Sequence, residues 1–326
     1  MAYKIFLDGG AGTTGLQIAD RLASRTDISL LVLDDATRKD KQARKAAMTE
    51  ADISILCLPD AAAIEATAMA AELGKDVRVI DASSAHRVHP DFVYGFAEMA
   101  TGQADKIANA RLVSNPGCYP TSFVALVRPL IDAGLLAPEA LLAAACVSGY
   151  SGGGRTMIER YEAGDAPGDA PGDAPGDAPA FGIYGLTLAH KHLPEMKVHS
   201  GLVDAPVFLP SVGQFPQGML VNIPLHQAQF SKAVSAADLT SCYRGAYGDS
   251  ALIKVGDAGG LDKHNFLVAE ALAGRDNMEI FVFADASESH FVLTARTDNL
   301  GKGAAGAAVQ NMNLMLGVDM LSGLQV

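Results

Sequence analysis

Short apolar runs separated by polar or helical stretches mark the first 115 residues. YKIFLD at 3–8, ISLLVL at 28–33 and ISILCL at 53–58 each predict a buried strand. Because such strands alternate with helices, the pattern predicts a parallel, doubly wound α/β sheet. In full, it predicts strands at 3–8, 28–33, 53–58, 77–81 and 111–114 and helices at 16–24, 37–48, 61–73 and 120–132.

The pattern changes beyond residue 132. Strand-like runs now dominate, with few helical stretches between them, and this predicts a second domain with a mostly antiparallel sheet and one covered face. A final helix is predicted at 302–320, and its small residues at 303–308 let it approach another backbone closely, so we expect it to dock on the first domain. The strand-like runs lie at 140–149, 201–209, 218–226, 264–273, 279–285 and 288–296.

One segment stands outside both patterns. Residues 164–179 repeat GDAP four times and are rich in Gly, Pro and Asp. Such a low-complexity, polar segment does not pack into a core. We expect an exposed loop and assign it no chemistry.

Composition and charge narrow the class of protein. The chain has 326 residues, of which 49% are hydrophobic, and its formal net charge is −12. An acidic chain repels nucleic-acid phosphates, and no apolar run reaches the ~20 residues needed to cross a bilayer. We therefore expect neither nucleic acid nor a membrane as a partner. The strand pattern starts at once without a signal segment, which predicts a cytoplasmic protein, and four scattered cysteines without a CxxC pair indicate neither a disulfide framework nor a zinc site.

A glycine-rich turn follows the first strand. GAGTTG, starting at Gly10, matches the GxGxxG pattern between a strand and a helix, the context that dinucleotide binding requires. Gly10 permits the turn, Gly12 lets the backbone approach a pyrophosphate, and Gly15 lets the helix pack on the strand. N–H groups at the helix start, around Thr13 and Thr14, then bind the anion. An ordinary glycine turn is the alternative interpretation.

The residues after the second strand leave the choice between NAD and NADP open. Asp34 and Asp35 stand where an acid binds the ribose 2′-OH. Arg38 and Lys39 follow closely and are able to pair with a 2′-phosphate.

Cys118 is the candidate nucleophile. It follows Asn115-Pro116-Gly117, and Pro120 suits a first helical turn because its missing N–H costs nothing there. At a helix N-terminus the macrodipole and the N–H groups favour the reactive thiolate and also bind an oxyanion. A structural cysteine in a turn is the alternative. The other cysteines lie in apolar strands or lack an evident activator, and they are Cys57, Cys146 and Cys242.

A reactive thiolate needs an acid–base partner. His190 and His192 flank Lys191 just before Pro194, and in an extended segment both imidazoles point to one side. A solvated polar turn is the alternative. A metal site requires a third ligand, and none lies close in sequence, so we expect no metal.

Several motifs together resemble the N-acetyl-γ-glutamyl-phosphate reductases of arginine biosynthesis, and the short bacterial branch (type 2) is the most similar. The resemblance covers nearly the whole chain in the expected order, and the GDAP repeat departs from it. The motifs are SNPGCYPT at 114–121, SGYSGGGR at 148–155, HKHLPEM at 190–196, DASSAHRVHPDFVYGFAEM at 81–99 and DNLGKGAAGAAVQNMN at 298–313.

The resemblance implies a fold like that of aspartate-semialdehyde dehydrogenase. An α/β NADP-binding Rossmann domain is expected at 1–116 plus 298–326, and an α+β catalytic and oligomerisation domain with a mostly antiparallel sheet at 117–297. The implied reaction is the NADPH-dependent reduction of N-acetyl-L-glutamyl 5-phosphate through a cysteine thioester. The implied assembly is a homo-oligomer, either a dimer or a tetramer, and the use of NADP(H) favours Arg38 and Lys39 as phosphate ligands.

The resemblance also implies roles for individual residues. Cys118 is the expected nucleophile and His192 the expected acid–base, while His190 is expected to contact or orient the substrate. Arginines suit bidentate oxyanions, but a structural ion pair is the alternative for each of them, and helix capping is the alternative for Asn299. The expected substrate-binding residues are His190, Arg87, Arg155 and Ser151, and the expected cofactor-binding residues are Gly10, Gly12, Thr13, Thr14, Gly15, Arg38, Lys39, Pro59, Ser83 and Asn299.

Two other functions are compatible with the same sequence. One is a related semialdehyde dehydrogenase that acts on aspartyl phosphate or aminoadipyl phosphate. The other is a non-catalytic NADP-binding redox sensor in which Cys118 is the sensing thiol, which would leave the paired histidines and Arg155 without a role.

Overall fold

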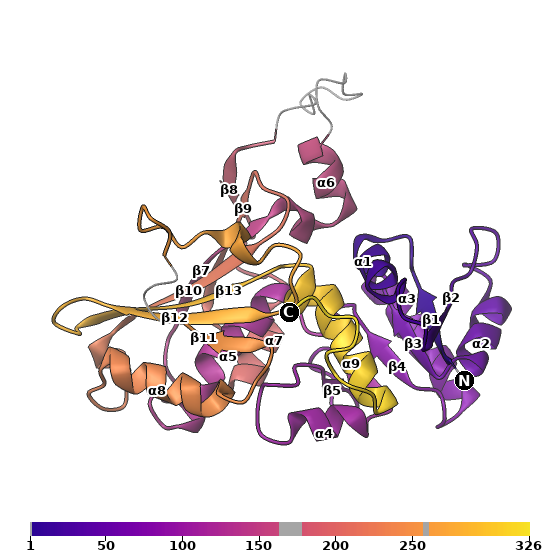
Figure 1. The fold of residues 1–326 in the computed structure, drawn as a ribbon, viewed down its shortest axis with the longest axis horizontal. Coiled ribbons are helices and arrows are strands. Elements are labelled where there is room, and N and C mark those ends of the chain that lie inside the picture. The colour runs from indigo at the N-terminus through magenta and orange to yellow at the C-terminus, as the bar shows by residue number, and fades with distance from the viewer. Residues whose placement is uncertain (1, 163–177, 257–260) are drawn as a thin grey trace. The chain divides into compact units, whose positions relative to one another are not determined.

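The chain divides into two compact units (Figure 1). The computed structural model describes residues 2–162, 178–256 and 261–326. The first unit comprises Met1–Gly117 and Ala304–Gln325, and the second comprises Cys118–Gly303 with Val326. Most of the predicted GDAP loop, residues 164–179, lies outside the described ranges.

The first unit is built on a six-stranded sheet in which all strand pairs are parallel, as predicted. Its order is β2-β1-β3-β4-β6-β5. The strands are β1 (Tyr3–Asp8), β2 (Ile28–Leu31), β3 (Ile53–Leu56), β4 (Val79–Asp81), β5 (Val93–Tyr94) and β6 (Leu112–Ser114). The helices are α1 (Thr13–Leu22), α2 (Lys41–Glu50), α3 (Asp60–Leu73), α4 (Gln103–Ala108) and α9 (Gly306–Leu316).

Successive side chains of β1 point to opposite faces of the sheet and enter two separate cores. Ile5 packs in one buried cluster with Ile18 of α1 and Met312 of α9. Phe6 packs in the other with Met48 of α2. The predicted docking of the C-terminal helix on the first domain is therefore confirmed, because α9 covers one face of this sheet.

The second unit contains a seven-stranded sheet in the order β11-β12-β13-β10-β7-β9-β8. Only β11–β12 and β7–β9 pair in parallel, so the predicted mostly antiparallel sheet is confirmed. The strands are β7 (Ala143–Gly149), β8 (Phe181–Ile183), β9 (Val207–Gly213), β10 (Met219–His226), β11 (Ile253–Val255), β12 (Met278–Ala284) and β13 (His290–Thr297). The helices are α5 (Cys118–Asp132), α6 (Arg155–Glu162), α7 (Leu193–Ser200) and α8 (Ala236–Tyr247), and the short 3₁₀ turns are η1 (Tyr150–Gly153), η2 (Gln227–Gln229) and η4 (Ala269–Leu272).

The helices α5 and α8 cover one face of this sheet, with α8 running along β11 and β12 (Figure 1). Pro129 lies inside α5 and has no N–H for the carbonyl of Ala125. The hydroxyl of Tyr247, on α8, donates to that carbonyl at 2.9 Å, and Tyr243 donates to the carbonyl of Leu126 at 2.6 Å. The two tyrosines thus satisfy carbonyls around the proline and join α8 to the helix that begins at Cys118.

Several predicted elements of the second unit are wrong. The predicted strand at 264–273 is a turn followed by η4, because the Asp262 carboxylate accepts from the N–H groups of His264 and Phe266 and fixes the turn. The predicted strand at 201–209 begins only at Val207, because Gly201 (φ 86°) ends α7 in a left-handed conformation.

The helices α6, α7 and α8 do not appear among the predicted elements. The start of α8 carries a sequence signal, since Ser235 and Asp238 form a capping box. Within the ranges 2–162, 178–256 and 261–326, no helix is both long and apolar enough to span a membrane.

Candidate active site

The glycine turn has the geometry of a dinucleotide loop. A Cβ on Gly15 would lie 2.6 Å from the carbonyl oxygen of Gly9, so only glycine lets α1 pack this closely on the turn. A Cβ on Gly12 would meet only that same oxygen, at 3.6 Å, which leaves space over the loop. Thr13 and Thr14 begin α1, where the first N–H groups lack intrahelical partners. These features fit a bound pyrophosphate.

Gly9, which was not among the predicted residues, makes the sharpest turn of the loop. Its φ is 87°, and a Cβ there would overlap the carbonyl of Cys57. The N–H of Cys57 donates to the carbonyl of Asp8 at 2.7 Å, so the end of β3 lies against the end of β1. Strand order reverses between these two strands, and ligands bind beyond the carboxyl ends at such a point. Pro59, which immediately precedes α3, follows β3 at this edge.

Arg38 and Lys39 line a pocket of about 270 Å³ beside the glycine loop. Nε of Arg38 lies 2.8 Å from Oδ1 of Asp35. Asp34 caps the turn instead, since its Oδ1 accepts from the N–H and the hydroxyl of Thr37, and this hydrogen bonding lowers the pKa of the Asp34 carboxyl. The cationic side chains of Arg38 and Lys39 line the pocket, and the Asp34 oxygen already accepts two hydrogen bonds. This arrangement fits a 2′-phosphate better than a free 2′-OH. The other residues that line the pocket are Asp8, Gly9, Arg44, Leu58, Ala62 and Glu65.

A buried ion pair forms part of the same pocket. Two nitrogens of Arg44 donate to Oδ2 of Asp8, at 2.9 and 2.6 Å. Burial raises the pKa of Asp8 despite this partner. The pair holds Arg44 beside the glycine loop, and neither residue was among the predicted cofactor ligands.

Ser83, which was predicted to bind the cofactor, makes hydrogen bonds within its own turn, to Asp81 and Ala85. Its N–H and its hydroxyl both donate to the buried carboxylate of Asp81, at 2.9 and 2.7 Å, and its oxygen accepts from the N–H of Ala85. The same carboxylate lies 2.6 Å from Nδ1 of His86. Ser83 therefore has no hydroxyl proton to give to a phosphate in this arrangement, and a cofactor contact of Ser83 stays a prediction.

Cys118 is the first residue of α5, as the sequence predicts, and it is half-buried. The backbone of Gly303 lies against it, because a Cβ on Gly303 would be 2.8 Å from Cβ of Cys118. Burial raises the pKa of the other three thiols, that of Cys57 to about 12 and those of Cys146 and Cys242 above their ordinary value. Burial thus disfavours the thiolate at these three positions, and Cys118, at the start of α5, stays the predicted nucleophile.

The rings of His190 and His192 form a cluster with the ring of Tyr119, the residue after Cys118. The His192 ring lies 6.1 Å from that of Tyr119, and the His190 ring lies 4.6 Å from that of His192. The segment is a turn rather than an extended strand, and Nδ1 of His190 accepts from the N–H of His192 at 3.2 Å. His192 caps α7 and is 7% exposed. This bond fixes the His190 ring against the turn, and whether His190 contacts or orients the substrate stays a prediction.

Glu195 belongs to this site and was missed as a site residue. It is 1% exposed, and its Oε1 lies 3.9 Å from Nε2 of His192. A buried carboxylate beside an imidazole stabilises the protonated ring. The signal in the sequence is an acid three residues after His192, in the first turn of the helix that Pro194 begins.

Arg155 does not lie in a buried site. It is on the exposed side of α6, and its Nε lies 2.6 Å from Oε1 of Glu159. This is the structural ion pair that the sequence left as the alternative. Arg87 is half-buried in the first unit, where its Nε donates to the carbonyl of Asn115 at 3.1 Å.

Ser151 and Asn299 bind each other. Nδ2 of Asn299 donates to Oγ of Ser151 at 2.9 Å, and Oγ of Ser151 donates to the carbonyl of Pro216 at 2.5 Å. Oδ1 of Asn299 accepts from the N–H of Gly218. A serine hydroxyl has one proton, so Ser151 cannot also donate to an anionic substrate. Asn299 neither caps a helix nor has its amide open to a nicotinamide in this arrangement, and binding by either residue stays a prediction.

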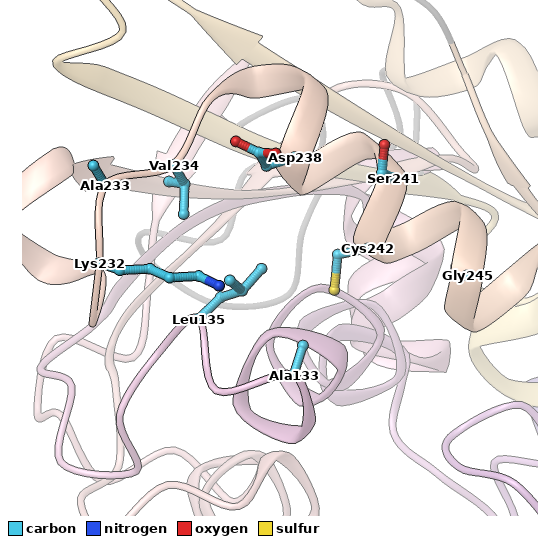
Figure 2. A pocket seen from close by; sticks show the side chains of 9 residues that line it. All are labelled: Ala133, Leu135, Lys232, Ala233, Val234, Asp238, Ser241, Cys242 and Gly245. Carbon is cyan, nitrogen blue, oxygen red and sulfur yellow. The ribbon is translucent and has the colours of Figure 1, made fainter.

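A cavity of about 570 Å³ lies away from the nucleophile (Figure 2). Lys232, Leu135 and Cys242 point into it, between the end of α5 and α8. Cys118 begins the 15-residue α5, and at about 1.5 Å per residue the cavity lies roughly 20 Å away from it. Among the described residues, no three His, Cys, Asp or Glu side chains form a metal-binding group.

Two family descriptions match the chain, one in each unit. Residues 4–110 match the family described as semialdehyde dehydrogenase, NAD binding domain, and residues 118–299 match semialdehyde dehydrogenase, dimerisation domain. The chain therefore belongs to the semialdehyde dehydrogenase class, with the glycine loop in one unit and Cys118 at the start of a helix in the other.

Similar proteins identify the family within this class to which the chain belongs. The chain is 48% identical to the N-acetyl-gamma-glutamyl-phosphate reductase of Brucella anthropi over 317 residues, 97% of this chain and 99% of that one. It is 47% identical to the enzyme of that name from Brucella ovis, over 97% of this chain and 100% of the relative. The chain belongs to the N-acetyl-gamma-glutamyl-phosphate reductase family.

Solved structures share the fold. Aspartate semialdehyde dehydrogenase II from Vibrio cholerae superposes with a TM-score of 0.74 at 17% identity, over 97% of this chain and 99% of that chain. The aspartate semialdehyde dehydrogenase from Francisella tularensis gives 0.71 at 13% identity, over 95% and 99%. The predicted fold class is therefore confirmed.

Proposed function

We propose that the chain catalyses the NADPH-dependent reduction of N-acetyl-L-glutamyl 5-phosphate to N-acetyl-L-glutamate 5-semialdehyde and phosphate, in arginine biosynthesis. Membership of the reductase family supports this reaction. The structural observation that carries it is the position of Cys118 at the start of α5, next to Tyr119, whose ring belongs to the cluster with His192.

The first step takes place at the Cys118 sulfur. The thiolate attacks the acyl carbon, the bond from that carbon to the phosphate oxygen breaks, and a thioester forms on Cys118 as phosphate leaves. N–H groups of the first turn of α5 stabilise the oxyanion that develops on the carbonyl oxygen. The bound NADPH supplies the hydride that reduces the thioester. The resulting thiohemiacetal on Cys118 loses its hydroxyl proton, its C–S bond breaks, and the aldehyde leaves with the thiolate restored.

His192 is the acid–base residue in this proposal. It takes the hydroxyl proton when the thiohemiacetal collapses and gives up a proton when the thioester is reduced. Glu195, at 3.9 Å, favours the imidazolium that gives up its proton at the reduction and forms again at the collapse. His190 orients the turn through its bond to the N–H of His192.

The substrate carries an acyl phosphate and a carboxylate, so it needs cations. Arg87 is our candidate, because its bonds to the carbonyls of Asn115 and Ala82 orient the guanidinium near the start of the nucleophile motif. Arg155 is a second candidate, and it would have to leave Glu159 to bind an anion.

NADP(H) is the proposed cofactor. The glycine loop fits its pyrophosphate, and Arg38 and Lys39 would pair with its 2′-phosphate at the pocket beside that loop. Pro59 lies at the same carboxyl edge.

We also propose that the chain is cytoplasmic and forms a homo-oligomer, a dimer or a tetramer, which light scattering of the purified chain measures. The match of residues 118–299 to a dimerisation domain supports the oligomer. Val207 and Val292, 53% and 37% exposed, leave apolar surface on strands of the second sheet for a second copy.

Phosphate-dependent reduction of NADP with N-acetylglutamate semialdehyde tests the proposal. Cys118→Ser should abolish this activity, because an alcohol is not ionised at neutral pH, and should leave NADPH binding intact. Cys242→Ser is the matched control, since Cys242 is also half-buried but is on α8, where its sulfur contacts the carbonyl of Pro129 near the far end of α5. An active Cys118→Ser variant would rule out the nucleophile, and activity with aspartyl phosphate but not with the glutamyl substrate would rule out the reaction.

A further inference from the structure

Two buried amides connect the C-terminal helix to the residue that opens the nucleophile motif. Nδ2 of Asn311, on α9, donates to the carbonyl of Gly95 at 2.9 Å and to Oδ1 of Asn115 at 3.1 Å. Nδ2 of Asn115 donates to the carbonyl of Ala304 at 2.8 Å. All four residues belong to the first unit.

This amide relay has only one workable orientation. Its two ends, at Gly95 and Ala304, are backbone carbonyls, which only accept, so turning either amide around would place oxygen against oxygen. Asn115 is 2% exposed and Asn311 is 0% exposed, so water does not substitute for a lost partner. Glycine is required at position 95, because a Cβ there would lie 3.0 Å from Cγ of Asn311. The relay therefore holds Asn115 in one place.

The backbone of Asn115 connects the relay to residues of the predicted site. Its N–H donates to the carbonyl of Asp81 at 2.7 Å, and its carbonyl accepts from Nε of Arg87 at 3.1 Å. Asn115 precedes Cys118 by three residues. Ala304 follows Gly303, whose backbone contacts Cys118 within the second unit. The relay thus joins the two chain segments that lead to the nucleophile.

We infer that Asn115 and Asn311 are positioning residues, and that their amide relay fixes both the Arg87 guanidinium and the 116–118 turn that presents the thiol. The inference rests on the proposed role of Cys118. Small displacements of a reacting group are costly, with a misplacement of about 1 Å reducing rates by about 10²-fold. Neither asparagine touches the reacting atoms in this account.

The chain offers a closely matched pair of substitutions. Asn311→Asp keeps the shape but turns the donor towards Gly95 and Asn115 into an anionic oxygen. Asn313→Asp is the control, because Asn313 lies on the same helix, is also 0% exposed, and uses its Nδ2 on two backbone carbonyls, those of Met320 and Ser322. Its Oδ1 accepts from Nη1 of Arg25 at 3.0 Å, so its partners are the C-terminal tail and Arg25, and neither belongs to the nucleophile motif.

Two readouts separate positioning from stability. The first is the rate at which iodoacetamide alkylates Cys118, followed by mass spectrometry of its peptide, and the second is the division of the effect between kcat and KM. Asn311→Asp should lower both the alkylation rate and kcat by about 10- to 100-fold, the cost of a displaced reacting group, while the KM for NADPH stays unchanged. Asn313→Asp should leave all three at the wild-type values, although both variants lose stability.

Equal effects of the two substitutions, measured at the same folded fraction by circular dichroism, would overturn the inference. If the aspartate variants do not fold, Asn311→Ser and Asn313→Ser make the same comparison with smaller, uncharged side chains. The alkylation assay needs no substrate. An active Cys118→Ser variant would therefore refute the proposed function, whereas unchanged alkylation in Asn311→Asp would refute the positioning role alone.

Discussion

At the scale of the residue, we propose that Arg38 selects NADPH over NADH. It lines the pocket beside the glycine loop, its side chain is half-exposed, and it forms an ion pair with Asp35. A guanidinium matches the geometry of a phosphate, whereas a ribose 2′-OH gains little from it.

Arg38→Ala should raise the KM for NADPH at least about tenfold, which corresponds to a loss of about 1.4 kcal/mol of binding. The KM for NADH and for the acyl phosphate should change little, because neither places a phosphate on this side chain. Steady-state kinetics with each of the three compounds measures this. A rise of equal size for NADH would refute the 2′-phosphate assignment.

Residue chemistry that is local in sequence could be predicted, and chemistry that depends on distant contacts could not. Cys118 at a helix start and the glycines of the loop follow from neighbours within a few positions. The amide of Asn299 finds its partners at Ser151 and Gly218, far away in sequence. No local sequence pattern shows that a side chain already makes such hydrogen bonds. The sequence therefore predicted a cofactor contact for Asn299 and did not show its bonds to Ser151 and Gly218.

At the scale of the element, α5 carries the nucleophile on a helix that contains a proline. Pro129 removes the donor that the Ala125 carbonyl would use, and Tyr247 replaces it from α8. A buried carbonyl without a partner costs about 1–3 kcal/mol, so the tyrosine hydroxyl stabilises α5 at its weakest turn.

Tyr247→Phe should reduce the free energy of unfolding, measured by urea titration, by about 1–3 kcal/mol, because the Ala125 carbonyl then stays buried without a donor. Tyr161→Phe provides the comparison, since the hydroxyl of Tyr161 donates to the carbonyl of Pro179 in an exposed position where water replaces it. A Tyr247→Phe variant as stable as Tyr161→Phe would show that the carbonyl finds another donor.

Most elements of the first unit were predicted, because they are apolar strands that alternate with helices, whereas the short β5 and α4 were missed. The second unit was harder for a physical reason. A turn there is set by a side chain, as at Asp262, and the sequence signal for α8 is its capping box, Ser235 and Asp238, not its apolar content. Apolar content alone therefore gave too many strands and too few helices.

At the scale of the whole molecule, the chain leaves the first unit after Gly117 and returns to it at Ala304. Cys118, the predicted nucleophile, is the first residue of the second unit. Gly303, which contacts it, is the last residue before the chain returns to the first unit. The predicted dinucleotide loop and the predicted nucleophile therefore belong to different units, so neither unit alone carries both.

The central claim is that Cys118 carries the acyl group during turnover. Mixing the protein with N-acetylglutamyl phosphate in the absence of NADPH, quenching with acid and analysing the peptides by mass spectrometry measures this directly. The account predicts an N-acetylglutamyl thioester on the Cys118 peptide that disappears when NADPH is added before the quench. An unmodified Cys118 under conditions where the enzyme turns over, or an acyl group on another residue, would contradict it.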